Sequence, residues 1–305
     1  MKIIPLGGLN EIGKNMTAIC YEDDIVVIDA GMAFPDDELL GIDYVLNDIT
    51  YLLENKEKVK AVLLTHGHED HIGGLSYFLK EINVPVFGTR LTLGLAEGRL
   101  KENKVSDYTL VPVKAGEEVK IGKFQVEFIR GSHSISDTVG IAVKTPIGMV
   151  IHTGDFKIDQ TPVDGKLIDL HRYAALGDEG VLVLMSDSTN AERPGYTPSE
   201  KTVGAVLDKK IGDADGRVIL ATFASSIPRL QQAVDAAFKH GRKIAIQGRS
   251  MVNVFGICQD LGYLNIPDGA LIDIDEINRL PAHKIMILTT GSQGEPLSAL
   301  ARMAA

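Results

Sequence analysis

The sequence is poor in cysteine, in long apolar runs and in positive charge. It has two cysteines in 305 residues, and 31 lysines and arginines against 41 aspartates and glutamates. So few cysteines exclude a disulfide-stapled domain, and we expect Cys20 and Cys258 to be small buried hydrophobic residues. The longest apolar runs are only strand-length, which excludes a membrane-spanning helix. The net charge of −10 argues against indiscriminate attachment to nucleic acid or anionic lipid, although it does not exclude a local basic groove.

The N-terminus also lacks the basic and apolar segments of a secretory signal, so we expect a cytoplasmic protein. What the chain does contain is an ordinary globular composition, 45% hydrophobic and 24% charged. The chain is longer than the size at which proteins usually keep a single hydrophobic core, which predicts two domains. We place the boundary in the proline- and glycine-containing segment 190–199 and expect domains at 1–195 and 196–305. The chain stops within a helical pattern, so we expect a fragment of a longer protein.

The two halves differ in rhythm. Up to about residue 190 short strands rich in valine and isoleucine dominate, interrupted by predicted helices at 71–82 and about 91–103. Beyond that point strands and helices alternate, which predicts a parallel sheet with covering helices. The expected elements there are 218–222, 227–239, 243–247, 251–261, 284–289 and 296–303.

Three of the eight histidines fall within six residues, directly after the apolar strand 59–64. His66 and His68 flank a glycine, so their rings can converge on one cation, while Asp70 and His71 open the next turn and can face a second position. A cluster of imidazoles with a carboxylate suits zinc and has no packing rationale of its own.

The cluster needs a further nitrogen ligand and a bridging carboxylate, for which we propose His133 and Asp155. A lone loop histidine such as His133 is commonly just solvated. We consider it as a metal ligand only because the site lacks a third nitrogen. Two cations about 3.5 to 4 Å apart can clamp the oxygens of a transferring phosphoryl group. No site role is expected for the other four histidines, His152, His171, His240 and His283.

With Asp29 at a strand end before it, this pattern resembles the metallo-β-lactamase fold. The resemblance implies an αββα sandwich that carries the site at one edge. It also implies the ligand sets: His66, His68 and His133 for one zinc, Asp70 and His71 for the other, and Asp155 between them. Asp29 would support the metal loop without binding metal; the alternative is a carboxylate that caps the turn at residues 30–31.

Further segments resemble the ribonuclease J family, whose members insert a β-CASP domain after the metal-binding part. These segments are 8–15, 34–35, 39–44, 66–74, 186–190, 221–225, 248–251 and 290–296. The resemblance implies a 5′-to-3′ exoribonuclease that also cuts internally, in RNA maturation and decay, and that forms dimers or tetramers or assembles with a paralogue. It implies that Asp187, after an apolar strand expected to be buried, supports the catalytic edge. Gly41 and Asp43 match a site for a hard cation such as calcium.

In the second half, several residues stand where strands turn into helices, so that their backbone N–H groups and hydroxyls provide a geometry that binds phosphate. They are Ala224, Ser225, Ser226, Arg249, Ser250, Ser292 and Gln293, and Pro296 occupies a plausible first helical position. The resemblance locates a 5′-terminal nucleotide near Ala224, Ser225 and Ser226. Ordinary helix capping is the alternative for each of these residues.

A local excess of positive charge supports a nucleic-acid substrate. Between residues 217 and 251 the sequence contains six basic residues and a single acid, Asp235. The basic residues are Arg217, Arg229, Lys239, Arg242, Lys243 and Arg249. For Lys239, Arg242 and Lys243 a solvated helix face is the preferred interpretation.

The sequence therefore predicts a two-zinc ribonuclease that takes 5′-monophosphorylated RNA, with Asp155, Asp70, His71 and Asp187 as catalytic residues. The ligands do not distinguish zinc from manganese or magnesium. Since fold is not function, a small-molecule hydrolase such as a lactonase or thioesterase is the first alternative. A non-catalytic RNA-binding subunit is the second alternative. The complete set of His66, His68, Asp70 and His71 is evidence against it.

Overall fold

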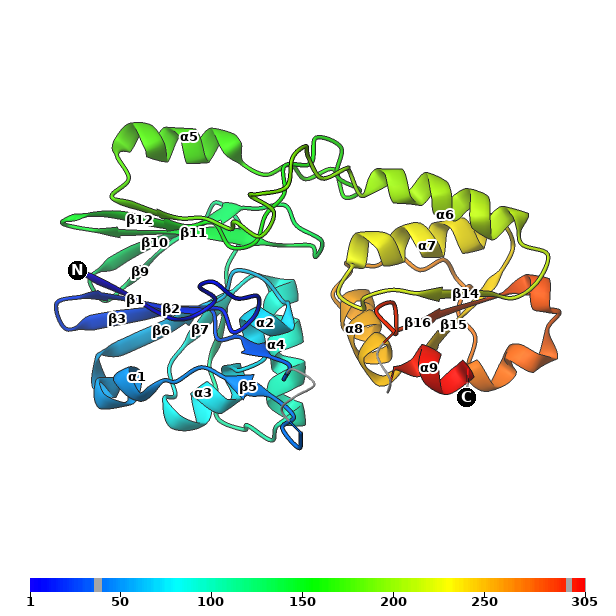
Figure 1. Cartoon of the computed structure of the whole chain (residues 1–305), viewed down its shortest axis with the longest axis horizontal. Coiled ribbons are helices and arrows are strands. Elements are labelled where there is room, and N and C mark those ends of the chain that lie inside the picture. Colours follow the sequence, from blue (N-terminus) through cyan, green and yellow to red (C-terminus); the bar gives the residue numbers. More distant parts are fainter. Residues whose placement is uncertain (36–39, 295–297, 305) are drawn as a thin grey trace. The chain divides into compact units, whose positions relative to one another are not determined.

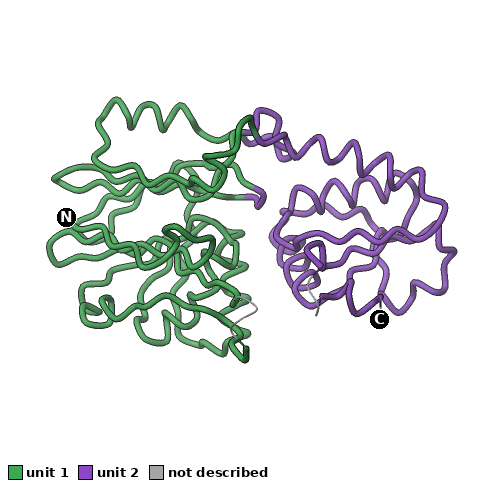
Figure 2. Tube along the Cα trace, in the orientation of Figure 1, with its two compact units in different colours: residues 1–133, 137–158, 167–196 green, residues 134–136, 159–166, 197–305 purple. Residues whose placement is uncertain are grey.

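The computed structural model describes residues 1–35, 40–294 and 298–304, which form two compact units (Figures 1 and 2). The first unit comprises residues 1–133, 137–158 and 167–196, and the second 134–136, 159–166 and 197–305. The chain thus passes several times between the units. Within the described ranges, no helix combines the length and apolar character needed to cross a membrane.

The first unit is built on two sheets. One has the strand order β1-β2-β3-β6-β7-β8 and the other β13-β12-β11-β10-β9. The strands of the first sheet are β1 (Lys2–Gly7), β2 (Met16–Tyr21), β3 (Asp24–Ile28), β6 (Val59–Leu63), β7 (Val86–Gly88) and β8 (Leu110–Pro112). Those of the second are β9 (Glu118–Ile121), β10 (Phe124–Arg130), β11 (Val139–Thr145), β12 (Gly148–His152) and β13 (Val183–Met185). A two-stranded ribbon, β4 (Met32–Ala33) and β5 (Val45–Leu46), stands beside them.

The two sheets share one apolar core. Side chains such as Val26 and Leu63 from one sheet pack with Phe128 and Ile141 from the other, and all are almost fully buried. Helices α1 (Thr50–Glu54), α3 (Leu75–Glu81) and α4 (Arg90–Glu102) lie on the outer side of the first sheet (Figure 1). Helix α5 (Leu170–Glu179) covers the outer side of the second, where Leu176 packs against its apolar face. The predicted αββα sandwich is therefore confirmed.

Two expectations for this unit are wrong. The single helix predicted at 71–82 is two helices, α2 (Glu69–Ile72) and α3, separated at Gly73 and Gly74. A Cβ on Gly74 would lie 2.6 Å from the carbonyl oxygen of Gly31, so the chain must turn there to let two backbones approach. Strand β13 is an edge strand rather than a buried one, since among the described strands it pairs with β12 alone, and Leu182 and Leu184 beside and within it are more than half exposed.

The second unit has the predicted parallel sheet. Its order is β14-β16-β15, formed by Val218–Ala221, Ile285–Thr289 and Lys243–Gln247. Around it stand α6 (Lys201–Asp213), α7 (Ile227–Lys239), α8 (Arg249–Asp260) and α9 (Ala299–Ala304). Helix α6 was not predicted, although Val203, Val206, Leu207 and Ile211 recur at helical spacing. Pro296, the expected helix start, lies outside the described residues.

Two of the six basic residues between positions 217 and 251 pair with acids within the fold. Arg229 forms a two-pronged ion pair with Glu200 at 2.7 and 3.1 Å, and Lys239 pairs with Asp208 at 2.7 Å. Both acids lie at α6, outside the window in which the sequence shows an excess of charge. The local excess of positive charge is therefore smaller on the folded surface than in the sequence window.

Arg242 is not on a solvated helix face, as its sequence context had indicated. Its side chain is 4% exposed, and it follows α7 directly before β15. The guanidinium donates to backbone carbonyls at 2.8 to 3.3 Å, those of Ile211, Gly216 and Ile285, and also to that of Ala214. Arg242 thus satisfies the carbonyls at the end of α6 and in the turn that follows.

Arg242→Met should lower the free energy of unfolding by about 2–4 kcal/mol, because it leaves several buried carbonyls without donors. Urea denaturation followed by far-UV circular dichroism measures the loss. Arg279→Met is the matched control, since the Arg279 side chain is 75% exposed and pairs only within its own turn, with Glu276. Equal unfolding midpoints for the two variants would contradict the role assigned to Arg242.

Candidate metal centre

The predicted metal ligands come from loops that leave the two sheets at the same edge. His66 and His68 lie between β6 and α2, His133 follows β10, and Asp155 follows β12. Strands β3 and β6 are parallel, and β10 and β12 run the same way because each is antiparallel to β11. The carboxyl ends of these strands meet, and His66, His68, His133 and Asp155 all belong to the first unit.

The structure brings the predicted ligand atoms together. His66 Nε2 lies 3.0 Å from His68 Nδ1, and the three nitrogens of His66, His68 and His133 lie within 4.8 Å of one another. A second group within the same limit consists of His66, His71 and Asp155.

Asp155 is central to the cluster. Its carboxylate oxygens lie 3.4 Å from His71 Nε2, 3.7 Å from His133 Nε2 and 4.0 Å from His66 Nε2. Asp70 Oδ2, predicted to bind the second metal with His71, lies 3.5 Å from His71 Nε2. The carboxylate predicted to bridge two metals thus faces histidines of both predicted ligand sets.

Asp29 lies beneath the cluster, almost completely buried and with a positive φ of 59°. Its carboxylate accepts hydrogen bonds from the backbone N–H and the hydroxyl of Thr65, both at 2.8 Å, and lies 2.7 Å from His71 Nδ1. These bonds hold a backbone conformation that costs energy in a residue other than glycine. They support the metal loop rather than the turn at residues 30–31.

The surroundings of the site lower the pKa values of His66, His68 and Asp155, which favours neutral rings and a charged carboxylate. Burial, with the neighbouring histidines, lowers the pKa of His66 well below its usual range, and burial lowers the pKa of His68 to about 3. Burial opposes ionisation of Asp155, yet the hydrogen bond and charge of His71 outweigh it and lower the pKa of Asp155 to about 2. Neutral imidazoles and ionised carboxylates are the forms that bind metal.

His71 behaves differently because acids surround it. Burial acts to lower its pKa, but the charge of Asp29 and hydrogen bonds to Asp155, Asp29 and Asp70 outweigh burial and raise the pKa well above its usual range. A bound cation would take the place of the Nε2 proton that these acids favour. The donor set, four imidazoles and two carboxylates, therefore fits divalent metal ions.

Asp187 and one unpredicted residue attach neighbouring segments to the site. Asp187 accepts from the N–H of Phe156, the residue after Asp155, at 3.4 Å, while its own N–H donates to Thr153 at 3.0 Å. Asn15 was not predicted, although its Nδ2 lies 3.2 Å from Asp70 Oδ2 and 3.1 Å from His71 Nε2. Its place in the segment 8–15 was the only signal that pointed to it.

The residues predicted to contact RNA lie in the second unit, at the carboxyl ends of its three parallel strands. Ser225 and Ser226 connect β14 to α7, Arg249 and Ser250 begin α8 after β15, and Ser292 lies in a turn after β16. The Ser226 side chain makes no capping bond to α7, so capping does not explain it. The Thr222 hydroxyl at the end of β14 is buried without a hydrogen-bond partner among the described residues.

Gly41 and Asp43, the predicted calcium ligands, lie in an exposed turn before β5, and Gly41 has a φ of 80°. Both cysteines are free and buried, as expected. The turn that contains Gly41 adds no histidine or buried carboxylate to the metal cluster.

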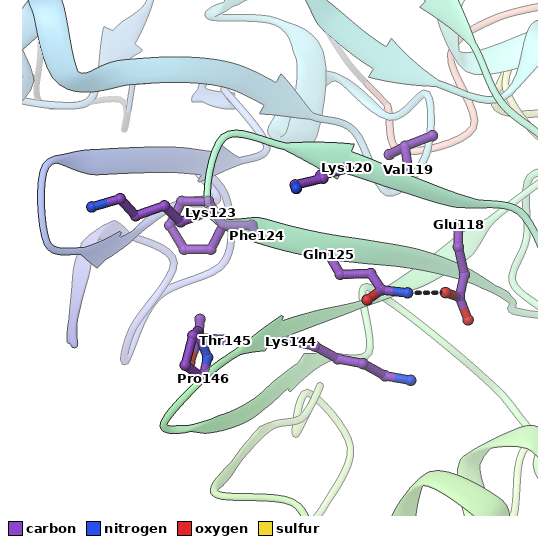
Figure 3. A pocket seen from close by; sticks show the side chains of 9 residues that line it. All are labelled: Glu118, Val119, Lys120, Lys123, Phe124, Gln125, Lys144, Thr145 and Pro146. Carbon is purple, nitrogen blue, oxygen red and sulfur yellow. Dashed lines mark hydrogen bonds between the residues drawn. The ribbon is translucent and has the colours of Figure 1, made fainter.

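A pocket of about 660 Å³ lies at the opposite end of the second sheet, where β10 starts at Phe124 (Figure 3). Three lysines line it, but Lys123 pairs with Glu22, and Lys144 pairs with Glu179 at 3.3 Å. The pocket contains no histidine and none of the predicted site residues. It therefore does not compete with the histidine cluster as a metal site.

Comparison with known families identifies both parts of the chain. The model of the metallo-beta-lactamase superfamily matches residues 9–191, and the model described as "Ribonuclease J, beta-CASP domain" matches residues 215–305. Among solved structures, a protein of unknown function from Enterococcus faecalis V583 has a TM-score of 0.68 at 14% identity, over 95% of this chain and 77% of that one. This likeness concerns the fold alone.

Curated relatives match over the whole chain. Ribonuclease J of Synechocystis sp. is 50% identical over 99% of this chain and 48% of its own length. Ribonuclease J of Thermus thermophilus is 48% identical over 100% of this chain and 54% of its own, and ribonuclease J2 of Bacillus subtilis is 45% identical over 100% and 55%. The chain thus spans about half the length of the curated relatives it matches.

Proposed function

Because the chain belongs to the ribonuclease J family of the metallo-β-lactamase superfamily, we propose that it acts as a metal-dependent ribonuclease. The observation that carries the proposal is the convergence of four histidines and two aspartates at one sheet edge, in a chain of this family. We propose RNA with a 5′-monophosphate as the substrate, degraded from the 5′ end and also cut internally. The work of such an enzyme is RNA maturation and decay.

We propose two zinc ions in the cluster. His66, His68 and His133 would hold one, Asp70 and His71 the other, and Asp155 both. When bound, the metal would supply an activated water and stabilise negative charge on the phosphate oxygens. Manganese and magnesium are the alternative cations. Adding zinc, manganese or magnesium in turn to metal-free protein and measuring RNA cleavage tests which cation the site uses.

The residues of the chain orient the reactants. The ionised Asp155 carboxylate accepts hydrogen bonds and so can orient the attacking water toward phosphorus. Asp187 restrains the segment that carries Asp155 through the N–H of Phe156, and Asp29 restrains His71. These bonds are in place before substrate binds, which reduces the reorganisation that the reaction requires.

For the RNA end we propose the carboxyl edge of the second unit's sheet. Backbone N–H groups at the starts of α7 and α8, the hydroxyls of Ser225, Ser226, Ser250 and Ser292, and the exposed Arg249 provide donors for phosphate. The unsatisfied Thr222 hydroxyl supports a polar ligand at this edge.

Ser225→Ala and Arg249→Ala should each weaken RNA binding about 3- to 10-fold, the contribution of one hydrogen bond to phosphate, without loss of metal. Equilibrium binding of a labelled 5′-monophosphorylated oligonucleotide at fixed salt measures the effect. Arg279→Ala serves as the control for charge alone, because Arg279 is exposed on a different turn. Unchanged affinity in both variants would return Ser225 and Arg249 to a local structural role.

Substrate class is tested by turnover. The protein should cleave 5′-monophosphorylated RNA and leave lactone and thioester panels unhydrolysed at the same enzyme concentration. Faster turnover of an ester would support a small-molecule hydrolase, and RNA binding without cleavage by zinc-loaded protein would support a non-catalytic subunit.

Further proposals follow from the family. We propose a calcium ion at Gly41 and Asp43, domains at 1–195 and 196–305, and assembly into dimers or tetramers or with a paralogue. Light scattering at several protein concentrations measures the assembly, and calcium titration followed by calorimetry tests the cation.

A further inference from the structure

Thr65 lies between the metal ligands and the buried acid beneath them, and no metal-binding role requires it. Its side chain is completely buried. Its Oγ1 lies 2.8 Å from Asp29 Oδ2, 3.0 Å from His66 Nδ1 and 3.4 Å from His71 Nδ1. One hydroxyl therefore contacts the acid and two of the predicted ligands.

The direction of these hydrogen bonds follows from a count of protons. An ionised carboxylate only accepts, whereas a hydroxyl has one proton to donate and lone pairs with which to accept. The Thr65 hydroxyl therefore donates to Asp29, as its backbone N–H does at the other carboxylate oxygen. Its lone pairs then face His66 Nδ1, so that nitrogen must carry the ring proton.

Asp29 holds His71 directly, at the same ring atom. Its Nδ1 lies 2.7 Å from Asp29 Oδ2, which can only accept, so Nδ1 carries the proton here too. In both rings Nε2 is left as the atom that faces Asp155, at 4.0 Å from His66 and 3.4 Å from His71. A neutral ring protonated at Nδ1 has its lone pair on Nε2.

We propose that Thr65 is a positioning residue that transmits the orientation set by Asp29 to His66, so that one buried carboxylate fixes the Nδ1 proton, and with it the ring orientation, of a ligand in each predicted metal group. His71 receives this constraint directly and His66 only through the Thr65 hydroxyl. The proposal rests on the proposed metal-dependent function only for its purpose, because the tautomers themselves are a property of the metal-free protein.

The tautomers are measured by long-range ¹H–¹⁵N spectra of metal-free protein with ¹⁵N-labelled histidine. In the unsubstituted protein we expect His66 protonated at Nδ1 alone, and His71 protonated at Nδ1 and, beside Asp70 and Asp155, also at Nε2. In Thr65→Val the His66 proton should no longer be held at Nδ1, and the protonation of His71 should be unchanged. Thr65→Ser keeps a hydroxyl, so both rings should keep the protonation of the unsubstituted protein. A wild-type His66 protonated at Nε2, or a His66 unaffected by Thr65→Val, would overturn the proposal.

Asp29→Asn provides an independent test that does not depend on the folding of the valine variant. The amide oxygen must face the Thr65 N–H, so the NH₂ group takes the position of Oδ2 and donates to Thr65 and His71. The Thr65 hydroxyl must then donate to His66, so the His66 proton should move to Nε2 and His71 should lose its Nδ1 proton. A change at His71 alone would show that Thr65 does not couple Asp29 to His66.

Zinc titration into the metal-free variants gives the functional consequence without an activity assay. We expect Thr65→Val to weaken zinc binding about 10- to 100-fold, as loss of a supporting hydrogen bond does elsewhere, and Thr65→Ser to stay near the parent value. Zinc affinity unchanged in Thr65→Val would overturn the positioning role. Protein with the expected tautomers that binds zinc but does not cleave RNA would instead refute the proposed function and leave the role of Thr65 intact.

Discussion

His66→Ala is expected to remove bound metal and RNA cleavage together. His66 is fully buried and belongs to both groups of three clustered ligand atoms, so its loss leaves the first proposed metal with two imidazoles and the shared Asp155 and removes a neighbour of the second. Metal affinity should fall far below that of the parent, and cleavage by at least about 10²- to 10³-fold, because charge on the phosphate oxygens is no longer compensated. Elemental analysis after dialysis and single-turnover cleavage of labelled RNA give the two measurements.

His283→Ala is the matched control, since His283 is an exposed histidine of the second unit that belongs to no ligand group among the described residues. It should keep full metal content and activity. Far-UV circular dichroism establishes that His66→Ala remains folded. Full metal occupancy in a folded His66→Ala protein would refute the assignment of the cluster as a metal centre.

Asp155→Asn is expected to abolish cleavage while RNA binding persists. The carboxylate faces three histidines and its pKa is lowered to about 2, so the parent protein holds a negative charge there at every pH of interest. The amide has nearly the same size but only one acceptor and no charge. Cleavage should fall at least about 10²- to 10³-fold, whereas the affinity for a 5′-monophosphorylated oligonucleotide should change only a few-fold.

Asp178→Asn controls for the removal of one negative charge, because Asp178 is exposed on α5. Cleavage rate and filter binding are compared for the two variants and the parent at the same salt concentration. Equal loss of binding and cleavage in Asp155→Asn would mean that Asp155 organises the fold or the RNA site. Retained cleavage would remove it from the reaction.

The sequence by itself determined the local parts of this protein. The spacing of His66, His68, Asp70 and His71 is a property of six consecutive residues, and the alternation of strands and helices after residue 218 is legible from local periodicity. Both features reappear in the structure because backbone geometry over a few residues produces them. His133 and Asp155, on distant loops, were proposed because the cluster lacked a third nitrogen and a bridging carboxylate, and the resemblance then implied how the ligands divide between two metals.

Tertiary structure alone decided what depends on contact between segments far apart in the chain. Gly73 and Gly74 interrupt a helical pattern because the backbone of Gly31 approaches there, and Arg242 is buried because it meets carbonyls at the end of α6. The same holds for Asn15 beside Asp70, and for Thr65 between Asp29 and His66. A threonine or an asparagine has no spacing that marks it, and its hydrogen-bond partners are chosen only when the two sheets bring their loops to one edge.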